Sequence, residues 1–190
     1  MITFGYKYLF INISTTGLNP VKDFLLEVVA TLVSDKFNLL ANEYYLIKPD
    51  DKEIEELEIT LDLIKQRKRA GENLRIKDVT LDELIKFGFN KSAVRDNLKN
   101  LLHRTDTTFL VNGLTQEFLE SKLEVCVPTK VVYVLDAVKA AFNFKGSLFQ
   151  AYNELLSGKE INLAIEKALQ NDNVLVKQGL LVLMAFTKII

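Results

Sequence analysis

The sequence predicts an α/β domain of three layers, in which helices cover both faces of a mixed five-stranded sheet. Short runs of large and β-branched apolar residues come first, strands then alternate with helical patterns, and the last part of the chain is helical in its periodicity. The chain has 190 residues, of which 48% are apolar and 26% charged. This length and composition are typical of one globular domain, which we expect to cover residues 1–190.

Three strands are predicted near the start of the chain. Tyr8–Ile13 is an apolar run broken by Asn12, as expected for a central strand covered on both faces. Leu25–Ser34 and Leu39–Lys48 are two further runs, and only residues 35–38 separate them. Because so short a connection favours antiparallel neighbours, the sheet is predicted to begin as a meander.

The periodicity changes from strand to helix after Pro49. Apolar residues then recur at helical spacing on one face, at Ile54, Leu57, Leu61 and Ile64. The first turns of this helix are acidic, and its last turns carry Lys65, Arg67, Lys68 and Arg69, which suits the helix dipole. The basic cluster has two interpretations: a solvated helix end, or a small patch that contacts phosphate.

The remaining elements alternate between the two types. After a polar linker at 70–77, Thr80 is a suitable N-cap for a helix over Leu81–Phe87, and Ser92–His103 forms the next helix. The elements predicted after these are the strands Thr107–Val111 and Lys130–Leu135, the helix Thr115–Leu123 between them, and the helices Ala137–Phe142, Ser147–Leu156, Asn162–Leu169 and Val174–Ile190.

Charge and cysteine content limit the classes of function. A net charge of −1 gives no general attraction to phosphate, so nucleic-acid binding would need a local patch. The single cysteine, Cys126, excludes an internal disulfide and fits a reducing compartment; we expect it to be a buried small apolar residue. Without a secretory signal or an apolar run of about 18 residues, a cytoplasmic protein with no membrane association is expected. The sole histidine, His103, is expected at the surface.

The most specific pattern is the first strand with the turn and strand that follow it. FINISTTGLNP and then FLLEVVATLVSD, which includes Glu27, resemble the first motif of the DnaQ-like (DEDD) 3′–5′ exonuclease superfamily. In that family the strand carries an Asp and, two residues later, a Glu, whereas this chain has Asn12 and Ser14. The resemblance covers nearly the whole chain and implies a ribonuclease H-like fold.

Within the superfamily, the oligoribonuclease-like branch is the most similar in spacing. That branch has a long helical insert after the third strand and a motif of the form N-S-I-G-Q-D after the fourth. Here the fourth predicted strand leads into NGLTQE, residues 112–117. The resemblance therefore places Glu117 where the Asp of the second motif stands. Asp136 also matches a family position, although not that of a metal ligand.

The third motif has two possible alignments. The family has H-x-A-x-x-D at the start of its last helix, and NLAIEK fits this spacing with Asn162 at the His and Lys167 at the Asp. A second frame puts Glu166 at the His and Asn171 at the Asp. We prefer the first frame because its residues enter a helix rather than leave one. Neither frame retains both the general base and the carboxylate.

The chemistry of the family explains why these replacements matter. Two divalent cations about 4 Å apart activate a water and stabilise the leaving oxygen, and Mg²⁺ or Mn²⁺ requires anionic oxygen ligands. Of the four carboxylates that hold the metals in the family, the resemblance retains Glu117 alone. We therefore predict a degenerate, catalytically inactive domain without a metal cofactor. The alternatives are an active exonuclease with atypical ligands and a protein-interaction scaffold.

Binding is the property that this pattern would leave intact. In the family, the residues after the Glu form a pocket for the 3′-terminal nucleotide, and Thr15, Thr16, Gly17 and Leu18 match them. Either this match reflects retained binding of single-stranded nucleic acid, or the fold needs a tight turn here. A replication or repair protein is a further expected partner. The apolar segment 174–190 suits a core helix or an interface, including that of a homodimer, which the oligoribonuclease branch forms.

Overall fold

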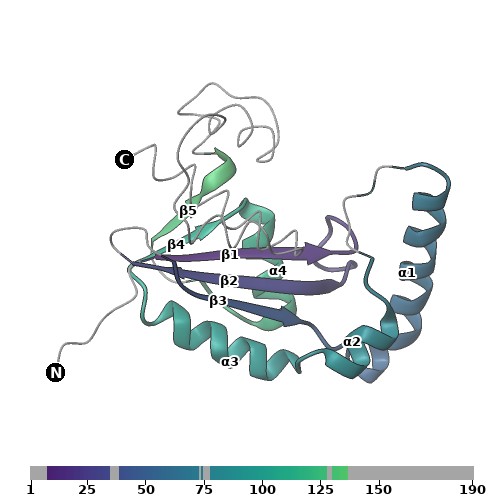
Figure 1. Cartoon of the computed structure of the whole chain (residues 1–190), viewed down its shortest axis with the longest axis horizontal. Helices are drawn as coiled ribbons and strands as arrows, with labels where there is room; N and C mark the ends of the chain where they lie inside the picture. The colour runs from purple at the N-terminus through teal and green to yellow at the C-terminus, as the bar shows by residue number, and fades with distance from the viewer. Residues whose placement is uncertain (1–7, 35–38, 73, 75–77, 128–129, 137–190) are drawn as a thin grey trace.

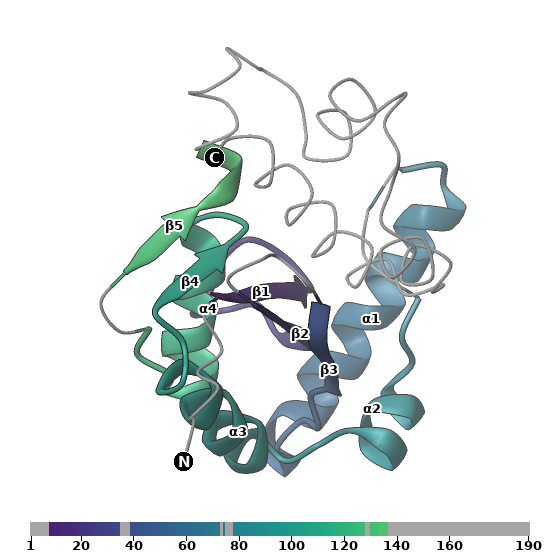
Figure 2. The same ribbon diagram turned by 60° about the vertical axis from the view of Figure 1, so that its left-hand side comes forward.

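The computed structural model describes residues 8–34, 39–72, 74, 78–127 and 130–136. Within these ranges one five-stranded sheet is accompanied by helices on one face and at one end (Figure 1, Figure 2). The elements are β1 (Tyr8–Thr15), β2 (Leu25–Val33), β3 (Leu39–Leu46), a 3₁₀ helix η1 (Asp51–Glu53), α1 (Ile54–Arg69), α2 (Leu81–Phe87), α3 (Lys91–Leu102), β4 (Thr107–Leu110), α4 (Gly113–Leu123) and β5 (Val131–Tyr133).

The sheet is mixed, with strand order β3-β2-β1-β4-β5. The pairs β1–β2 and β2–β3 are antiparallel, as the short connections between these strands predict. The pairs β1–β4 and β4–β5 are parallel, because α1, α2 and α3 intervene before β4 and α4 before β5. The predicted mixed five-stranded sheet is thereby confirmed, with β1 at its centre.

One face of the sheet holds the main apolar core. Leu9 and Ile11 of β1 are buried there with residues of α3 and α4, including Leu98 and Phe118. In a strand, alternate side chains point to opposite faces, so Phe10, Asn12 and Ser14 belong to the second face. Phe10 stacks there on Phe109 of β4, with 4.5 Å between ring centroids. The four helices predicted after Asp136 lie outside the described residues.

A second apolar cluster attaches α1 and α2 to the start of β2. Phe24 and Leu26 pack with Leu57 of α1 and Leu84 of α2. The N-terminus of α2 is closed by Thr80, whose hydroxyl accepts a hydrogen bond from the Glu83 amide, as predicted. The helix predicted over Ser92–His103 is likewise confirmed as α3, and its buried residues are Val94, Leu98, Leu101 and Leu102.

The structure corrects one prediction and adjusts several boundaries. Cys126 is exposed rather than buried. It lies in an extended segment where Val125 and Val127 point inward, and this alternation turns Cys126 outward. β5 is shorter than predicted, and α4 begins earlier because the Asn112 side chain caps it by accepting from the Thr115 amide at 3.1 Å.

His103 is exposed at the end of α3, as predicted. None of the helices among the described residues combines the length and apolar character that a membrane crossing requires.

Candidate nucleic-acid site

The two positions that carry acidic ligands in the resembling family lie side by side on β1. Asn12 is 5% exposed, and its Oδ1 accepts a hydrogen bond from the Ile13 amide at 2.9 Å. Ser14 is half-buried, two residues further along the same face. Both side chains are neutral, so this part of β1 presents an amide and a hydroxyl where carboxylates would hold a metal.

A buried carboxylate lies next to these positions on the neighbouring strand. Glu27 is fully buried on β2 and is paired directly with Ser14 across the β1–β2 ladder. The Cβ atoms of such a pair are about 5 Å apart. Tyr44 of β3 donates its hydroxyl hydrogen bond to Glu27 Oε1. Glu27 was not among the predicted site residues, although it is the single charged residue of β2, a strand that is buried along its whole length.

The loop between β1 and β2 is closed by hydrogen bonds that use both threonines. The Thr16 amide donates to the Phe24 carbonyl at 3.0 Å, and the Phe24 amide donates to Thr16 Oγ1 at 2.9 Å. The Thr15 hydroxyl donates to the Gly17 carbonyl at 2.6 Å. These contacts give Thr15 and Thr16 a structural function in the turn, whatever else they bind.

The tip of the loop is a compact Asx turn. The Asn19 side-chain oxygen accepts from the Val21 amide at 3.0 Å, and Asp23 Oδ2 accepts from the Asn19 amide at 2.7 Å. A Cβ on Gly17 would lie 2.4 Å from that Asp23 oxygen, so a side chain at this position would displace Asp23. The backbone of the loop is therefore fixed by its own side chains.

Two large apolar side chains project from this fixed backbone. Leu18 and Val21 are each 80% exposed. The loop is also attached to α4, because the Ser121 hydroxyl donates to the Pro20 carbonyl at 2.9 Å and Lys122 Nζ donates to the Val21 carbonyl at 3.2 Å. The loop therefore exposes two apolar side chains on a backbone that α4 and its own side chains hold in place.

Glu117 lies on the second turn of α4 and is exposed. Residues four apart share a helix face, so Glu117 is on the same face as Ser121, which bonds the loop at Pro20. The preceding residue, Gln116, accepts a hydrogen bond from the Tyr133 hydroxyl at 2.5 Å. Glu117 thus belongs to the face of α4 that adjoins the loop.

The oxygen donors near β1 do not match what Mg²⁺ and Mn²⁺, the metals of the resembling family, require. Among the described residues, no three His, Cys, Asp or Glu side chains are placed to hold a metal ion together. β1 offers the neutral Asn12 and Ser14, with Glu27 as the one adjacent carboxylate. These groups do not fit a pair of Mg²⁺ or Mn²⁺ ions. The third-motif positions Asn162, Glu166, Lys167 and Asn171 lie outside the described residues.

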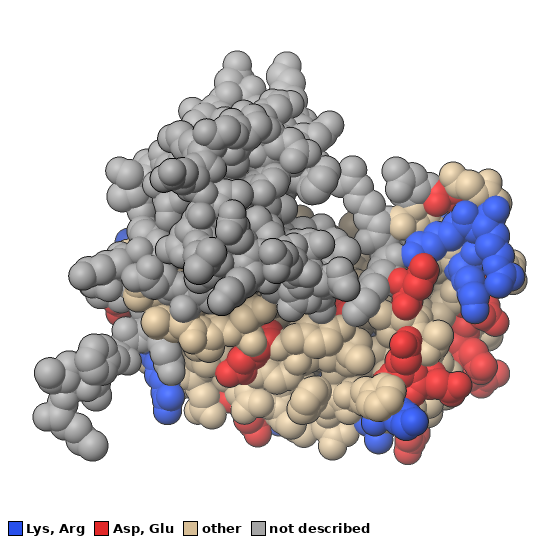
Figure 3. Space-filling model, viewed as in Figure 1, with Lys and Arg blue, Asp and Glu red and all other residues tan. Residues whose placement is uncertain are grey.

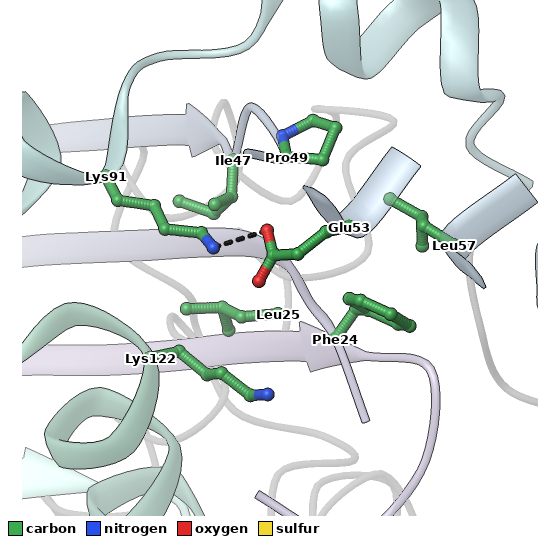
Figure 4. Close-up of a pocket in the computed structure, with 8 residues that line it drawn as sticks. All are labelled: Phe24, Leu25, Ile47, Pro49, Glu53, Leu57, Lys91 and Lys122. Atoms are coloured by element: carbon green, nitrogen blue, oxygen red, sulfur yellow. Dashed lines mark hydrogen bonds and ion pairs between the residues drawn. The ribbon is translucent and has the colours of Figure 1, made fainter. Parts of the chain in front are cut away.

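The cavity beside Phe24, at the end of the loop, is too small to receive a nucleotide. It has a volume of about 10 Å³, near the minimum for one water molecule. Figure 4 shows Phe24, Lys122 and Lys91 around it, with Lys91 Nζ directed at Glu53 at a distance of 2.5 Å. Lys91 Nζ also lies 2.9 Å from Asp50 Oδ2, so the cluster joins the start of α3 to η1. We interpret it as an anchor of the fold.

Comparison with solved structures identifies the fold. Product-bound exonuclease I aligns with 95% of this chain and 43% of its own, with a TM-score of 0.59 and 14% identity. E. coli exonuclease I in complex with a dA16 oligonucleotide aligns with 71% of this chain and 29% of its own, with a TM-score of 0.52 and 16% identity. The metal-free form of the E. coli exonuclease I complex with single-stranded DNA gives the same four values.

The chain has the ribonuclease H-like fold of these exonucleases. Likeness at this level of identity establishes the fold alone, and the chain spans less than half the length of each of these proteins. A scan against protein-family models and a search of curated proteins both find no match.

Proposed function

We propose that this chain is an exonuclease-like domain that binds the 3′ end of single-stranded nucleic acid without hydrolysing it. The observation that carries the proposal is the fixed β1–β2 loop, which presents Leu18 and Val21 to solvent directly after the neutral positions Asn12 and Ser14. The exposed loop supports a binding function, and among the described residues no three His, Cys, Asp or Glu side chains are placed to hold a metal ion.

The chemistry of the loop suits the end of a strand. Bases present apolar faces, and burying a Leu or Val side chain against one contributes about 1.5–3 kcal/mol. Lys22, exposed on the same loop and without an ion-pair partner among the described residues, supplies a cation for a phosphate. Single-strand binders combine cationic groups that contact the backbone with side chains that pack on the bases. In this loop Lys22 would serve the first purpose, and the aliphatic Leu18 and Val21 the second.

The same residues do not support hydrolysis. Stabilising developing charge and generating hydroxide are the main contributions of metals to phosphodiester cleavage. An amide, a hydroxyl and one neighbouring carboxylate cannot hold two hard dications. The alternative of an active exonuclease would require further ligands, from residues that the structure does not describe or from Glu117.

The exonuclease I structures support the idea that a strand can be bound in the absence of a metal ion. One of them is a metal-free complex with single-stranded DNA. In that protein, therefore, a strand is held without the metal. We extend this to the present chain as part of the proposal, since the likeness itself extends only to the fold.

The proposal is tested by fluorescence anisotropy with an oligonucleotide that ends in a 3′ hydroxyl and with the same oligonucleotide carrying a 3′ phosphate. We expect saturable binding that favours the 3′ hydroxyl. Leu18→Ala should weaken binding about tenfold, because about 1.4 kcal/mol of apolar contact is lost. Leu40→Ala is the matched control, since Leu40 is 50% exposed on β3. Failure of the wild-type chain to bind either oligonucleotide would refute the proposal.

Other partners stay predictions. Association with a replication or repair protein and formation of a homodimer were inferred from the family and from the apolar segment 174–190. That segment lies outside the described residues, as does all of the chain after Asp136. The choice between DNA and RNA is decided by repeating the binding measurement with both.

A further inference from the structure

We infer that the C-terminal end of α1 is a second contact surface for the same strand, where Lys65 and Arg69 bind phosphates on the 5′ side of the terminal nucleotide. This inference rests on the proposed function, because it extends the strand away from the β1–β2 loop. It names a phosphate-binding surface that lies outside the motif positions.

The surface is the strongest local concentration of positive charge in the described helices. Four of the five residues from Lys65 to Arg69 are Lys or Arg and none is acidic, in a chain whose net charge is −1. Figure 3 shows these side chains gathered at one end of α1, with acidic side chains over its other half. A polyanion would therefore find an attractive surface at this end only.

The arrangement of the cations leaves two of them available. Arg67 pairs with Glu72 at 2.6 Å, and Lys68 pairs with Asp78 at 2.7 Å. Lys65 and Arg69 are exposed and have no ion-pair partner among the described residues.

These available cations are also close to each other on the helix. They are four residues apart on one face, where like charges repel each other. The helix dipole favours cations at this end but does not require them to cluster. A bound phosphate, being negatively charged, would relieve the repulsion between them.

The effect of these cations on a nearby carboxyl group agrees with this picture. Lys68 lowers the pKa of Asp78 through its hydrogen bond and its charge, and the charge of Lys65 adds to the effect. Lys65 therefore acts on a carboxylate to which it forms no ion pair.

The surface is placed to meet a strand that leaves the loop. Leu57, near the start of α1, packs with Phe24 at the end of the β1–β2 loop. Lys65 is eight residues later, about 12 Å along the helix axis. In Figure 1 and Figure 2, the C-terminal end of α1 stands on the opposite side of the sheet from α3. Asn12 and Ser14 face that side, because α3 packs on the face of Leu9 and Ile11.

A neighbouring groove limits the extent of the contact. Between α1 and residues 78–82 there is a groove of about 620 Å³, lined by Lys65, Lys68 and Arg69 on one side. Its acidic lining residues are Glu58, Asp62, Asp78 and Asp82. These carboxylates disfavour a polyanion inside the groove, so the phosphates are confined to the last turn of the helix.

The test compares the salt dependence of binding for two oligonucleotides, a trinucleotide and one of roughly 12 nucleotides, within the usual site sizes of single-strand binders. Lys65→Gln/Arg69→Gln removes the two available cations. Lys99→Gln/Arg104→Gln removes two exposed cations of the α3 region and is the charge-matched control. All four side chains are exposed, so both variants are expected to melt with the wild type.

We expect the slope of log K against log salt to fall by about 1.4 for the longer oligonucleotide in the α1 variant, since each phosphate contact on a single strand contributes about 0.7. The trinucleotide should bind the α1 variant as it binds the wild type, and the control should keep the wild-type slope. If both oligonucleotides bind the wild type but the α1 variant keeps its slope, this inference is wrong and the proposed function stands. If the wild type binds neither, the proposed function fails first.

Discussion

Asn12 and Ser14 on β1 are neutral at the two positions where the family resemblance places metal-binding carboxylates. Asn12 and Ser14 present an amide oxygen and a hydroxyl, and the one buried carboxylate nearby, Glu27, bonds the Tyr44 hydroxyl. A hard dication needs several anionic oxygens, so the charge balance of the site depends on these residues. The first prediction therefore changes that balance.

Asn12→Asp/Ser14→Glu would restore the acidic pair of the family beside Glu27. Without metal, we expect the free energy of unfolding to fall by about 3 kcal/mol, because two carboxylates enter a buried site next to a third. Millimolar Mn²⁺ should raise the melting temperature of the variant through preferential binding to the folded state. The wild type, measured in parallel, should show no such increase; an equal increase would show a metal site in the natural chain.

Gly17 fixes the conformation of the loop through its lack of a side chain. In Gly17→Ala the new Cβ would meet Asp23, whose carboxylate accepts from the Asn19 amide. We expect a loss of about 1 kcal/mol of stability, the value of a typical hydrogen bond, and weaker oligonucleotide binding. Gly113→Ala is the control, because nothing lies within 4 Å of its added Cβ. Unchanged binding by Gly17→Ala would show that the loop need not be rigid.

At the scale of elements, the loop depends on the helices that hold it. Side chains of α4 donate hydrogen bonds to the loop carbonyls of Pro20 and Val21, and α1 packs against Phe24. η1 and the start of α3 are in turn joined by Lys91, which contacts Asp50 and Glu53. Lys91 therefore fixes the segment that leads into α1 against the start of α3.

Lys91→Met keeps most of the aliphatic side chain and removes the charge. We expect the free energy of unfolding in urea to fall by about 1.5–3 kcal/mol, as for loss of a hydrogen bond to a charged group. The side chain of Lys91 is 20% exposed and that of Glu53 is 18% exposed, so solvent screening reduces the value toward the lower figure. Lys99→Met, on the exposed side of α3, should change stability by less than about 0.5 kcal/mol. Equal effects would exclude an anchoring function for the Lys91 cluster.

For the part of the molecule that the structure describes, up to Asp136, the order and type of the elements followed from the sequence. Hydrophobic periodicity distinguishes strands from helices, and the connection lengths set antiparallel or parallel pairing in this sheet. The features that were missed depend on register or on exposure. The position of Glu27 opposite Ser14 requires the β1–β2 pairing, and the outward orientation of Cys126 requires the phase of a short extended segment.

For the candidate site, the sequence proposes residues but not their surroundings. Asn12, Ser14 and Leu18 were identified from a motif, which gives residue types but no environment. Only the folded loop shows that the Thr16 hydroxyl accepts a hydrogen bond from the Phe24 amide. Only the folded loop shows that Val21 is as exposed as Leu18. From the sequence, Lys65 and Arg69 look the same as the other cations at this helix end. Only the structure shows that Arg67 and Lys68 are paired with Glu72 and Asp78.

The central claim is that this exonuclease fold binds a strand and leaves it intact. The most direct measurement follows the anisotropy of a 5′-labelled oligonucleotide over time, with the wild-type chain and Mn²⁺ present. We predict a rise on mixing that then stays constant. A subsequent fall below the value of the free oligonucleotide, which Glu117→Ala abolishes, would show shortening by an active site and would contradict the account.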